Sequence, residues 1–450
     1  MPCVVFSREG VGVSLLDYVQ PVSTIENETG RNEKERLKTE LRDALYRRLP
    51  SERIAGLLGV DREAAEREVA AALEQLSLDG SYRQLTFVER RTLVREVLNL
   101  IVGLGPLEEL LNDASITEIM VNGPRNVFFE RAGKISPSTV VFDDEQQLRM
   151  IIDRVVGPLG RRVDEQSPLV SARLEQGHRV NVVIPPLALD GPILTIRKFR
   201  KEVFTLDELV SMGSLDTALA DLLRWSVKGR KNIAVSGGTG GGKTTLLNAL
   251  SVEIPEDERI ITIEDAAELR FSKHPHVVRL ESRTKSIEGT SEVSIRDLVF
   301  NALRMRPDRI VVGECRGAEA LDMLQAMNTG HDGSLTTLHA NSPEDVIARL
   351  VMMCRYGMDL PVAVIEEQIG SALDIIVQID RGVDGARRIT RVCDCRSVAG
   401  EVRLTALVGW DAHRGCYEWE AVPEWLDALK LSPLIDAEEV TRWISCLRLH

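Results

Sequence analysis

The stretch SGGTGGGKTTLLNAL, residues 236–250, follows the apolar run NIAVS and opens the helical segment KTTLLNALS. It contains Gly237-x4-Gly242-Lys243-Thr244, the spacing of a phosphate-binding loop set between a strand and a helix. Glycines allow the backbone to turn with positive φ and to approach a phosphate closely. The amides at the following helix N-terminus point at the anion. These residues therefore predict a nucleotide site.

The chemistry of this loop predicts ATP and Mg²⁺ as its ligands. We expect Lys243 to reach the β- and γ-phosphates and the Thr244 hydroxyl to bind Mg²⁺. Five glycines in the six positions 237–242 exceed what the motif needs, so the loop should be mobile when it is empty. The residues predicted to bind the nucleotide from this stretch are Gly237, Gly238, Thr239, Gly240, Gly241, Gly242, Lys243, Thr244 and Thr245.

Two later apolar runs end in carboxylates. RIITIEDAAELRF (259–271) reaches Glu264, and RIVVGECRG (309–317) reaches Glu314, with Gly313 where an Asp often holds the metal. The carboxyl ends of strands in a doubly wound sheet converge on one crevice, so both acids can reach the phosphates. We expect Glu264 to act as a base toward water and Glu314 to act as a ligand of metal or water.

Histidines flank a further strand, in TGHDGSLTTLHANSPEDVIARL (329–350). His331 precedes the strand and His339 follows it. An imidazole at a strand end can hydrogen-bond a γ-phosphate and respond to its loss, which makes both histidines candidate nucleotide sensors. The alternative is a histidine that only caps or braces a loop.

Arginines are dense in GRRVDEQSPLVSARLEQGHRVN (160–181), which carries Arg161, Arg162, Arg173 and Arg179. Such a run is ordinarily a solvated face. A site with one lysine on the phosphates, however, often needs an arginine to stabilise the charge of the transition state, sometimes from a neighbouring subunit.

The periodicity predicts a multidomain α/β chain. Residues 1–30 are expected to be a mobile N-terminus, and leucines every four residues from Leu37 predict a helical bundle over 31–104. Residues 105–199 are predicted to form a small α+β domain, and 200–450 a linker and an α/β domain with a mostly parallel sheet and a C-terminal extension. In the small domain we expect a helix over 145–160 and strands at 118–123, 126–131, 139–144, 179–186 and 193–199.

Composition limits the partners and the compartment. The net charge of the 450 residues is −13, which argues against a chain that coats nucleic acid. Seven scattered cysteines suit free thiols in a reducing compartment, and Cys393 with Cys395 is the only close pair, so no zinc is expected. No apolar run approaches the ~18 residues of a membrane span, and the N-terminus lacks the features of a signal peptide. We expect a cytoplasmic protein that meets a membrane only through partners.

Several long stretches occur together with the phosphate loop: GLGPLEELL, ITEIMVNGP, SARLEQGHRVN, TIRKF, TIEDAAEL, and the segments 287–317 and 330–350. In this order they resemble the type II/IV secretion ATPases, and specifically the CpaF/TadA-type ATPase of tight-adherence (Flp) pilus assembly. The resemblance covers roughly residues 90–380. It implies a helical bundle, a PAS-like N-terminal domain and a RecA-like motor domain. It also implies a homo-hexameric ring at the cytoplasmic face of the inner membrane, working with inner-membrane platform proteins.

The resemblance also assigns roles to residues. Glu264 to Glu268 match the family's Asp box, Gly313-Glu314 its atypical Walker B motif, and His331 to His339 its His box. Arg173 and Arg179 are implied to reach the nucleotide of a neighbouring subunit, with Arg162 a weaker candidate. The chain departs from the pattern at Gly241, where Ser is usual, at Ser171, where Asp is usual, and after about residue 390. No paired CxxC module is present, which argues against the zinc-bearing general-secretion branch.

The leading hypothesis is an ATP-driven motor for pilus assembly or protein secretion, and two other classes of protein are alternatives to it. A DNA-associated RecA-like ATPase is disfavoured by the net acidity and by the lack of an evident basic and aromatic surface. A nucleotide-binding scaffold that does not hydrolyse is disfavoured by the complete set of Lys243, Thr244, Glu264 and Glu314. The sequence leaves open whether the motor drives extension or retraction.

Overall fold

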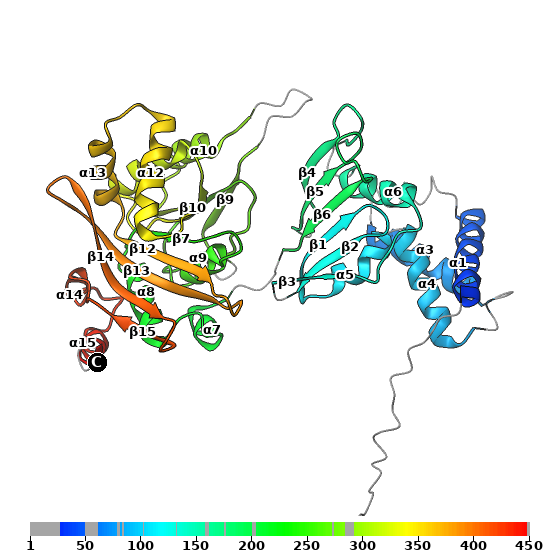
Figure 1. Cartoon of the computed structure of the whole chain (residues 1–450), viewed down its shortest axis with the longest axis horizontal. Coiled ribbons are helices and arrows are strands. Elements are labelled where there is room, and N and C mark those ends of the chain that lie inside the picture. Colours follow the sequence, from blue (N-terminus) through cyan, green and yellow to red (C-terminus); the bar gives the residue numbers. More distant parts are fainter. Residues whose placement is uncertain are drawn as a thin grey trace, which may run out of the picture. The chain divides into compact units, whose positions relative to one another are not determined.

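The computed structural model describes residues 28–49, 62–78, 82, 85–101, 103–131, 133–157, 162–174, 177–199, 204–271, 274–283 and 292–447. The predicted mobile N-terminus, residues 1–30, lies almost entirely outside the described residues, as does Arg161. The chain divides into two compact units, Met1–Phe199 and Arg200–His450, and each is described by itself (Figure 1).

The N-terminal unit begins with helices that pack through leucines. The helices are α1 (Glu28–Arg48), α3 (Arg62–Leu76) and α4 (Phe87–Ile101). Their apolar stripes bury one shared cluster, because residues spaced by three or four positions lie on one face of a helix. The buried leucines of α1 are Leu37, Leu41 and Leu45, and Leu49, directly after the helix, is buried with them.

The rest of this unit contains a six-stranded antiparallel sheet, in the order β3-β2-β1-β6-β5-β4, and a few short helices. The helix α6 (Glu145–Val156) buries Leu148, Ile152 and Val155 in the cluster that it shares with the sheet. The other elements are η2 (Gly105–Leu107), α5 (Glu108–Asn112), β1 (Ile116–Asn122), β2 (Val127–Arg131), β3 (Lys134–Pro137), β4 (Leu169–Arg173), β5 (Arg179–Val183) and β6 (Ile193–Arg197).

The strand predicted over 139–144 was wrong. Val140 and Phe142 are buried, as their alternation suggests, but the Phe142 amide donates to the carbonyl of Pro124 (2.8 Å) in place of a ladder. Asp144 then caps α6 by accepting from the amide of Gln147 (2.8 Å). The alternating apolar residues here are buried without joining a strand ladder. The two edge strands of the sheet are β3 and β4, which the sequence pattern did not predict.

The C-terminal unit is built on a nine-stranded sheet in the order β15-β14-β13-β12-β7-β11-β10-β8-β9. The strands from β12 to β9 in this order are parallel, and β13, β14 and β15 extend the sheet in antiparallel fashion. The strands are β7 (Ile233–Ser236), β8 (Ile260–Glu264), β9 (Val277–Glu281), β10 (Arg309–Cys315), β11 (Leu335–Leu338), β12 (Ile375–Arg381), β13 (Arg387–Val398), β14 (Glu401–Asp411) and β15 (Cys416–Trp419).

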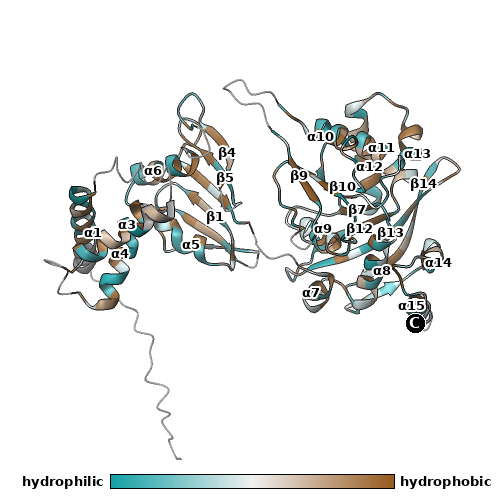
Figure 2. Ribbon diagram, turned by 180° about the vertical axis from the view of Figure 1, so that it is seen from behind, coloured by the Kyte–Doolittle hydropathy of each residue, from teal (hydrophilic) through white to brown (hydrophobic). Residues whose placement is uncertain are grey.

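Helices cover both faces of this sheet, which is why its parallel strands read as continuous apolar runs. Ile233 and Val235 of β7 pack on the side of α8 and α9, whereas Ala234 packs on the side of α10 to α13. The strands in both units carry most of the hydrophobic colour in Figure 2. The helices are α7 (Leu206–Ser211), α8 (Thr217–Lys228), α9 (Lys243–Ser251), α10 (Ile295–Ala302), α11 (Glu319–Asn328), α12 (Pro343–Gly357), α13 (Val362–Ala372), α14 (Trp425–Leu429) and α15 (Ala437–Leu447).

The tail after residue 390 completes the core. Trp443 of α15 packs edge-on against Trp225 of α8 (ring centroids 5.4 Å apart) and Trp419 of β15 (4.9 Å). Its indole N–H donates to the carbonyl of Ala218 (3.0 Å). The C-terminal helix is thereby fastened to the helix that precedes the phosphate loop in the chain.

Trp443→Ala should destabilise the C-terminal unit by about 3 kcal/mol, because it leaves a cavity in an aromatic cluster. Urea unfolding of the full chain followed by far-ultraviolet circular dichroism measures the effect. Leu431→Ala is the control, since that side chain is 89% exposed and its loss should cost within about 0.5 kcal/mol. Equal midpoints for the two variants would contradict the role of this cluster.

Candidate active site

Lys243 is a buried lysine at the first position of α9. The residue is only 7% exposed, and its ammonium donates to the carbonyls of Gly237 (3.0 Å) and Gly238 (2.9 Å). Gly242, with φ of 105°, turns the chain into the helix, a conformation that glycine adopts without strain. The loop therefore places its lysine and the amides of the helix N-terminus at the carboxyl end of β7.

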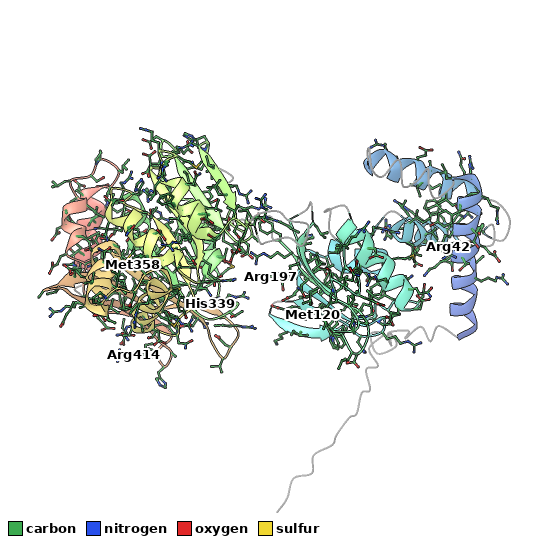
Figure 3. All side chains as sticks on the ribbon, turned by 90° about the horizontal axis from the view of Figure 1, so that it is seen from above. Arg42, Met120, Arg197, His339, Met358 and Arg414 are labelled. Atoms are coloured by element: carbon green, nitrogen blue, oxygen red, sulfur yellow. The ribbon has the colours of Figure 1, made fainter. Side chains whose placement is uncertain are left out.

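His339, which is labelled in Figure 3, lies between Lys243 and Glu314. Its Nδ1 is 3.2 Å from the Lys243 ammonium, and its Nε2 is 2.9 Å from Glu314 Oε1. Because an ammonium only donates, Nδ1 must accept and Nε2 carries the proton. Burial lowers the pKa of His339, and the charge of Lys243 lowers it further, which favours this neutral imidazole.

Glu314 is paired on its other side. Its Oε2 accepts from the Arg316 guanidinium (2.7 Å), which also lies 3.6 Å from Asp265. Burial raises the pKa of Glu314, but the hydrogen bond to Arg316 and the electrostatic influence of Arg316, His339 and Lys243 outweigh burial and leave the pKa below its usual value. Oε1 is buried and, despite the nearby imidazole, has no well-aligned hydrogen bond among the described residues.

Glu264 occupies the space that Gly313 leaves. A Cβ at position 313 would lie 2.7 Å from Cγ of Glu264, because Ile263 and Val312 are paired in neighbouring strands. Glu264 Oε1 accepts from the amides of Glu268 (2.7 Å) and Leu269 (2.9 Å). The glycine that replaces the usual Asp is thus required by the packing of a second acid.

Burial is the main influence on the titration of Glu264. It raises the pKa of this carboxyl to about 7, although the two backbone hydrogen bonds and Arg279 act in the opposite direction. Its Oε2 is buried and has no hydrogen-bond partner among the described residues. A carboxyl group with a pKa near neutrality and one free oxygen suits proton transfer near neutral pH.

The two predicted histidines lie at opposite edges of the sheet. His339 follows β11 at the edge where Ser236 and Leu338 are in register. His331 precedes β11, and its Nδ1 is 3.2 Å from the carbonyl of Ala326. Within this chain the structure brings His339 to the phosphate loop, and it does not bring His331 there.

The predicted arginines belong to the N-terminal unit. Arg173 ends β4, Arg179 begins β5, and the two are directly paired. Arg179 is paired in turn with Arg197 at the end of β6 (labelled in Figure 3), so the three occupy one cross-strand row. Arg162 lies in the segment before β4 and is exposed. Sequence reasoning missed Arg197, although the alternation in ILTIRKF places it on a strand.

Sequence reasoning also missed Gln378 in β12. It is 2% exposed, and its Oε1 accepts from the hydroxyl of Ser236 (2.5 Å) at the start of the phosphate loop. Its amide group donates to the carbonyl of Ala340 (3.3 Å), next to His339. One polar residue within the apolar run DIIVQID was the available signal, because buried amides need partners.

Comparison with known proteins shows the family of this chain. The family described as type II/IV secretion system protein matches residues 101–417. The chain belongs to this family. A putative conjugal transfer protein of Mycobacterium tuberculosis is 39% identical over 321 residues, which are 70% of this chain and 90% of that protein. The type IV secretion system protein PtlH of Bordetella pertussis is 37% identical over 319 residues, which are 65% and 93% of the two chains.

Among solved structures, the VirB11 ATPase of the Brucella suis type IV secretion system, in complex with sulphate, is similar to this chain. It is 34% identical, with 64% of this chain and 94% of that chain covered and a TM-score of 0.35. The predicted resemblance to type II/IV secretion ATPases is confirmed at the level of the family, and the tight-adherence branch stays a prediction. Within the described ranges, no helix combines the length and apolar character that a membrane span requires.

The residues present fit a complex of ATP with Mg²⁺. The loop offers positive-φ glycines at 240 (70°) and 242 (105°), a helix N-terminus and an ammonium, which together suit phosphate. The carboxylate of Glu314 and the hydroxyl of Thr244, in the first turn of α9, are oxygen donors of the kind that Mg²⁺ prefers.

Glu264 should hold a proton at about pH 6 and lose it by about pH 8, because its pKa is raised to about 7. Infrared difference spectra between these pH values should show a carboxylic acid C=O band that disappears with a midpoint near neutrality. Glu264→Gln should abolish this band, and the control Glu268→Gln should keep it. A midpoint near the ordinary value of 4.5 would contradict the burial argument.

Proposed function

We propose that this protein is an ATP-hydrolysing motor of a type II/IV secretion system. The observation that carries the proposal is the line of contacts from Lys243 through His339 to Glu314 beside a phosphate loop. Phosphate-binding groups, a candidate metal ligand and a carboxyl with a pKa near neutrality meet at one sheet edge, which is the equipment that phosphoryl transfer to water requires.

Each group has a part in this reaction. The loop amides and Lys243 bind the phosphates of ATP. Thr244 and Glu314 would hold Mg²⁺, which would neutralise phosphate charge. Glu264 accepts a proton from a water whose oxygen bonds to the γ-phosphorus. The bond from that phosphorus to the β–γ bridging oxygen breaks and leaves ADP and inorganic phosphate. His339 senses the γ-phosphate, since it contacts both Lys243 and Glu314.

The assembly and the setting follow from the family resemblance. We infer a homo-hexameric ring of RecA-like motor domains with PAS-like N-terminal domains, in which Arg173 and Arg179 face the nucleotide of a neighbouring subunit. The cross-strand row makes Arg197 a third candidate. The ring would act at the cytoplasmic face of the inner membrane on platform proteins, and the order of motifs supports tight-adherence pilus assembly as its task.

Lys243→Ala should abolish phosphate release from Mg²⁺-ATP, because the buried ammonium is the loop's charged phosphate ligand. Glu314→Gln should keep the affinity for ATP yet lower turnover by about 10²-fold, because loop amides and Lys243 supply most of the binding. Titration with a fluorescent ATP analogue and phosphate release measured on one preparation separate the two effects.

Lys228→Ala, at the end of α8, is the control for the lysine and should retain full turnover. Unchanged phosphate release in Lys243→Ala would show that the loop is not the site. Equal loss of binding and turnover in Glu314→Gln would show that this carboxylate is structural.

Arg173→Ala and Lys243→Ala subunits, each inactive alone, should recover part of the turnover when mixed. An intact phosphate loop in one subunit would then sometimes face an intact arginine of the next, and a trans arginine can be worth about 10³-fold in rate. Mixing Lys243→Ala with Glu314→Gln is the matched control, because both changes lie in the same half of the site and no combination is complete. Recovery is measured as phosphate release across mixing ratios.

No recovery in verified mixed rings, or full activity of a monomeric wild-type protein, would sink the trans assignment and leave ATP binding standing. Recovery in the control mixture would contradict it as well.

A further inference from the structure

The hairpin formed by β12 and β13 packs against the phosphate loop. A Cβ at Gly237 would collide with the carbonyl oxygen of Ile379 in β12. A Cβ at Gly241 would lie 3.1 Å from the same oxygen. The hairpin backbone therefore requires glycine at position 237, and a side chain at position 241 would need that backbone to shift by a few tenths of an ångström.

Arg387, the first residue of β13, makes the polar contact between the hairpin and the loop. Its Nε donates to the carbonyl of Gly240 (2.8 Å), and its Cδ would be 3.2 Å from a Cβ at Gly242. The guanidinium thus binds the loop through a carbonyl oxygen, a group that no phosphate could contact favourably.

This contact restrains the part of the loop that has the greatest backbone freedom. Residues 240–242 are three consecutive glycines, which have more backbone freedom to lose than any other residue type. Arg387 holds the carbonyl of the Gly240–Gly241 peptide, and the amide of the same peptide donates to the carbonyl of Gly238 (3.2 Å). Both sides of that peptide plane are therefore bonded, and the turn is closed before any ligand arrives.

The hairpin is itself anchored to the rest of the site. Gln378 of β12 accepts a hydrogen bond from the hydroxyl of Ser236 and donates one to the carbonyl of Ala340. Its amide group also donates to Asp380 (3.0 Å), whose other oxygen accepts from Thr390 of β13 (2.6 Å). The position of Arg387 is thus tied to the same strand ends that hold the loop and His339.

We propose that Arg387 is a positioning residue that keeps the phosphate loop in its nucleotide-accepting shape, so that the β12–β13 hairpin sets the affinity of the site for ATP. The inference rests on the proposed function as an ATPase. Arg387 acts through the loop and does not touch the reacting atoms. Its loss should therefore weaken binding of the nucleotide and spare the chemical step once the site is filled.

The experiment compares the full-length wild type with Arg387→Ala, Arg387→Lys and Arg391→Ala. Arg391 lies on the same strand, 3.7 Å from Glu420, and serves as the matched control. Binding of a fluorescent ATP analogue with Mg²⁺ gives Kd, and phosphate release gives kcat and KM. Melting temperatures within a few degrees of one another show that the variants are folded.

Arg387→Ala should raise Kd and KM about five- to tenfold, the scale of one charged hydrogen bond, with kcat within about twofold of wild type. Arg387→Lys should recover part of the affinity, because an ammonium at this position can still donate to the Gly240 carbonyl. Arg391→Ala should match the wild type.

Equal Kd values for wild type and Arg387→Ala would overturn the inference and leave the ATPase proposal intact. A fall in kcat with unchanged Kd would also overturn it, since that result would place Arg387 in the reaction. A wild-type protein that binds no nucleotide would overturn the proposed function and this inference with it.

Discussion

The buried ammonium of Lys243 is the charge around which the site is arranged. A buried charge is costly unless it is paired and hydrogen-bonded, and Lys243 meets this need through two loop carbonyls and His339. The imidazole passes the interaction to Glu314, and Arg316 balances that carboxylate in turn. Burial lowers the pKa of His339, and Arg316 lowers that of Glu314 against the effect of burial. The charge of Lys243 contributes to both shifts. A phosphate would replace the carbonyls as the lysine's partner, so that binding exchanges one set of contacts for another.

The sheet order determines which groups join this line. β11 lies between β7 and β10, and β8 lies beyond β10, so His339 stands between the loop and Glu314, and Glu264 lies on the far side. Gly313 lets Glu264 pack inward, where burial raises its pKa to about 7. Glu314 is held ionised by its cationic neighbours. Two carboxyl groups with opposite shifts are typical of sites that divide acid–base and electrostatic roles between them.

Local motifs and the convergence of strand ends were enough to predict the loop, both acids and His339. The same rule excludes His331 from this edge, because a residue that precedes a parallel strand lies at the opposite end of the sheet. The partners of Gln378 and Arg387 could not be predicted, since they depend on β12 pairing with β7 across more than a hundred residues of chain. Arg197 joins the arginine row only through the register of β5 and β6. The apolar alternation over 139–144 wrongly predicted a strand, because residues can be buried in alternation without pairing with a neighbouring strand.

A structure of the full chain with Mg²⁺ and a non-hydrolysable ATP analogue tests the central claim most directly. The account predicts that the β- and γ-phosphates lie in the loop of residues 237–242 and that the Lys243 ammonium leaves the carbonyls of Gly237 and Gly238 for phosphate oxygens. It also predicts that Glu314 faces the metal and that Glu264 remains packed on Gly313. A nucleotide bound elsewhere, or a Lys243 ammonium that stays on the loop carbonyls with the analogue bound, would contradict the account.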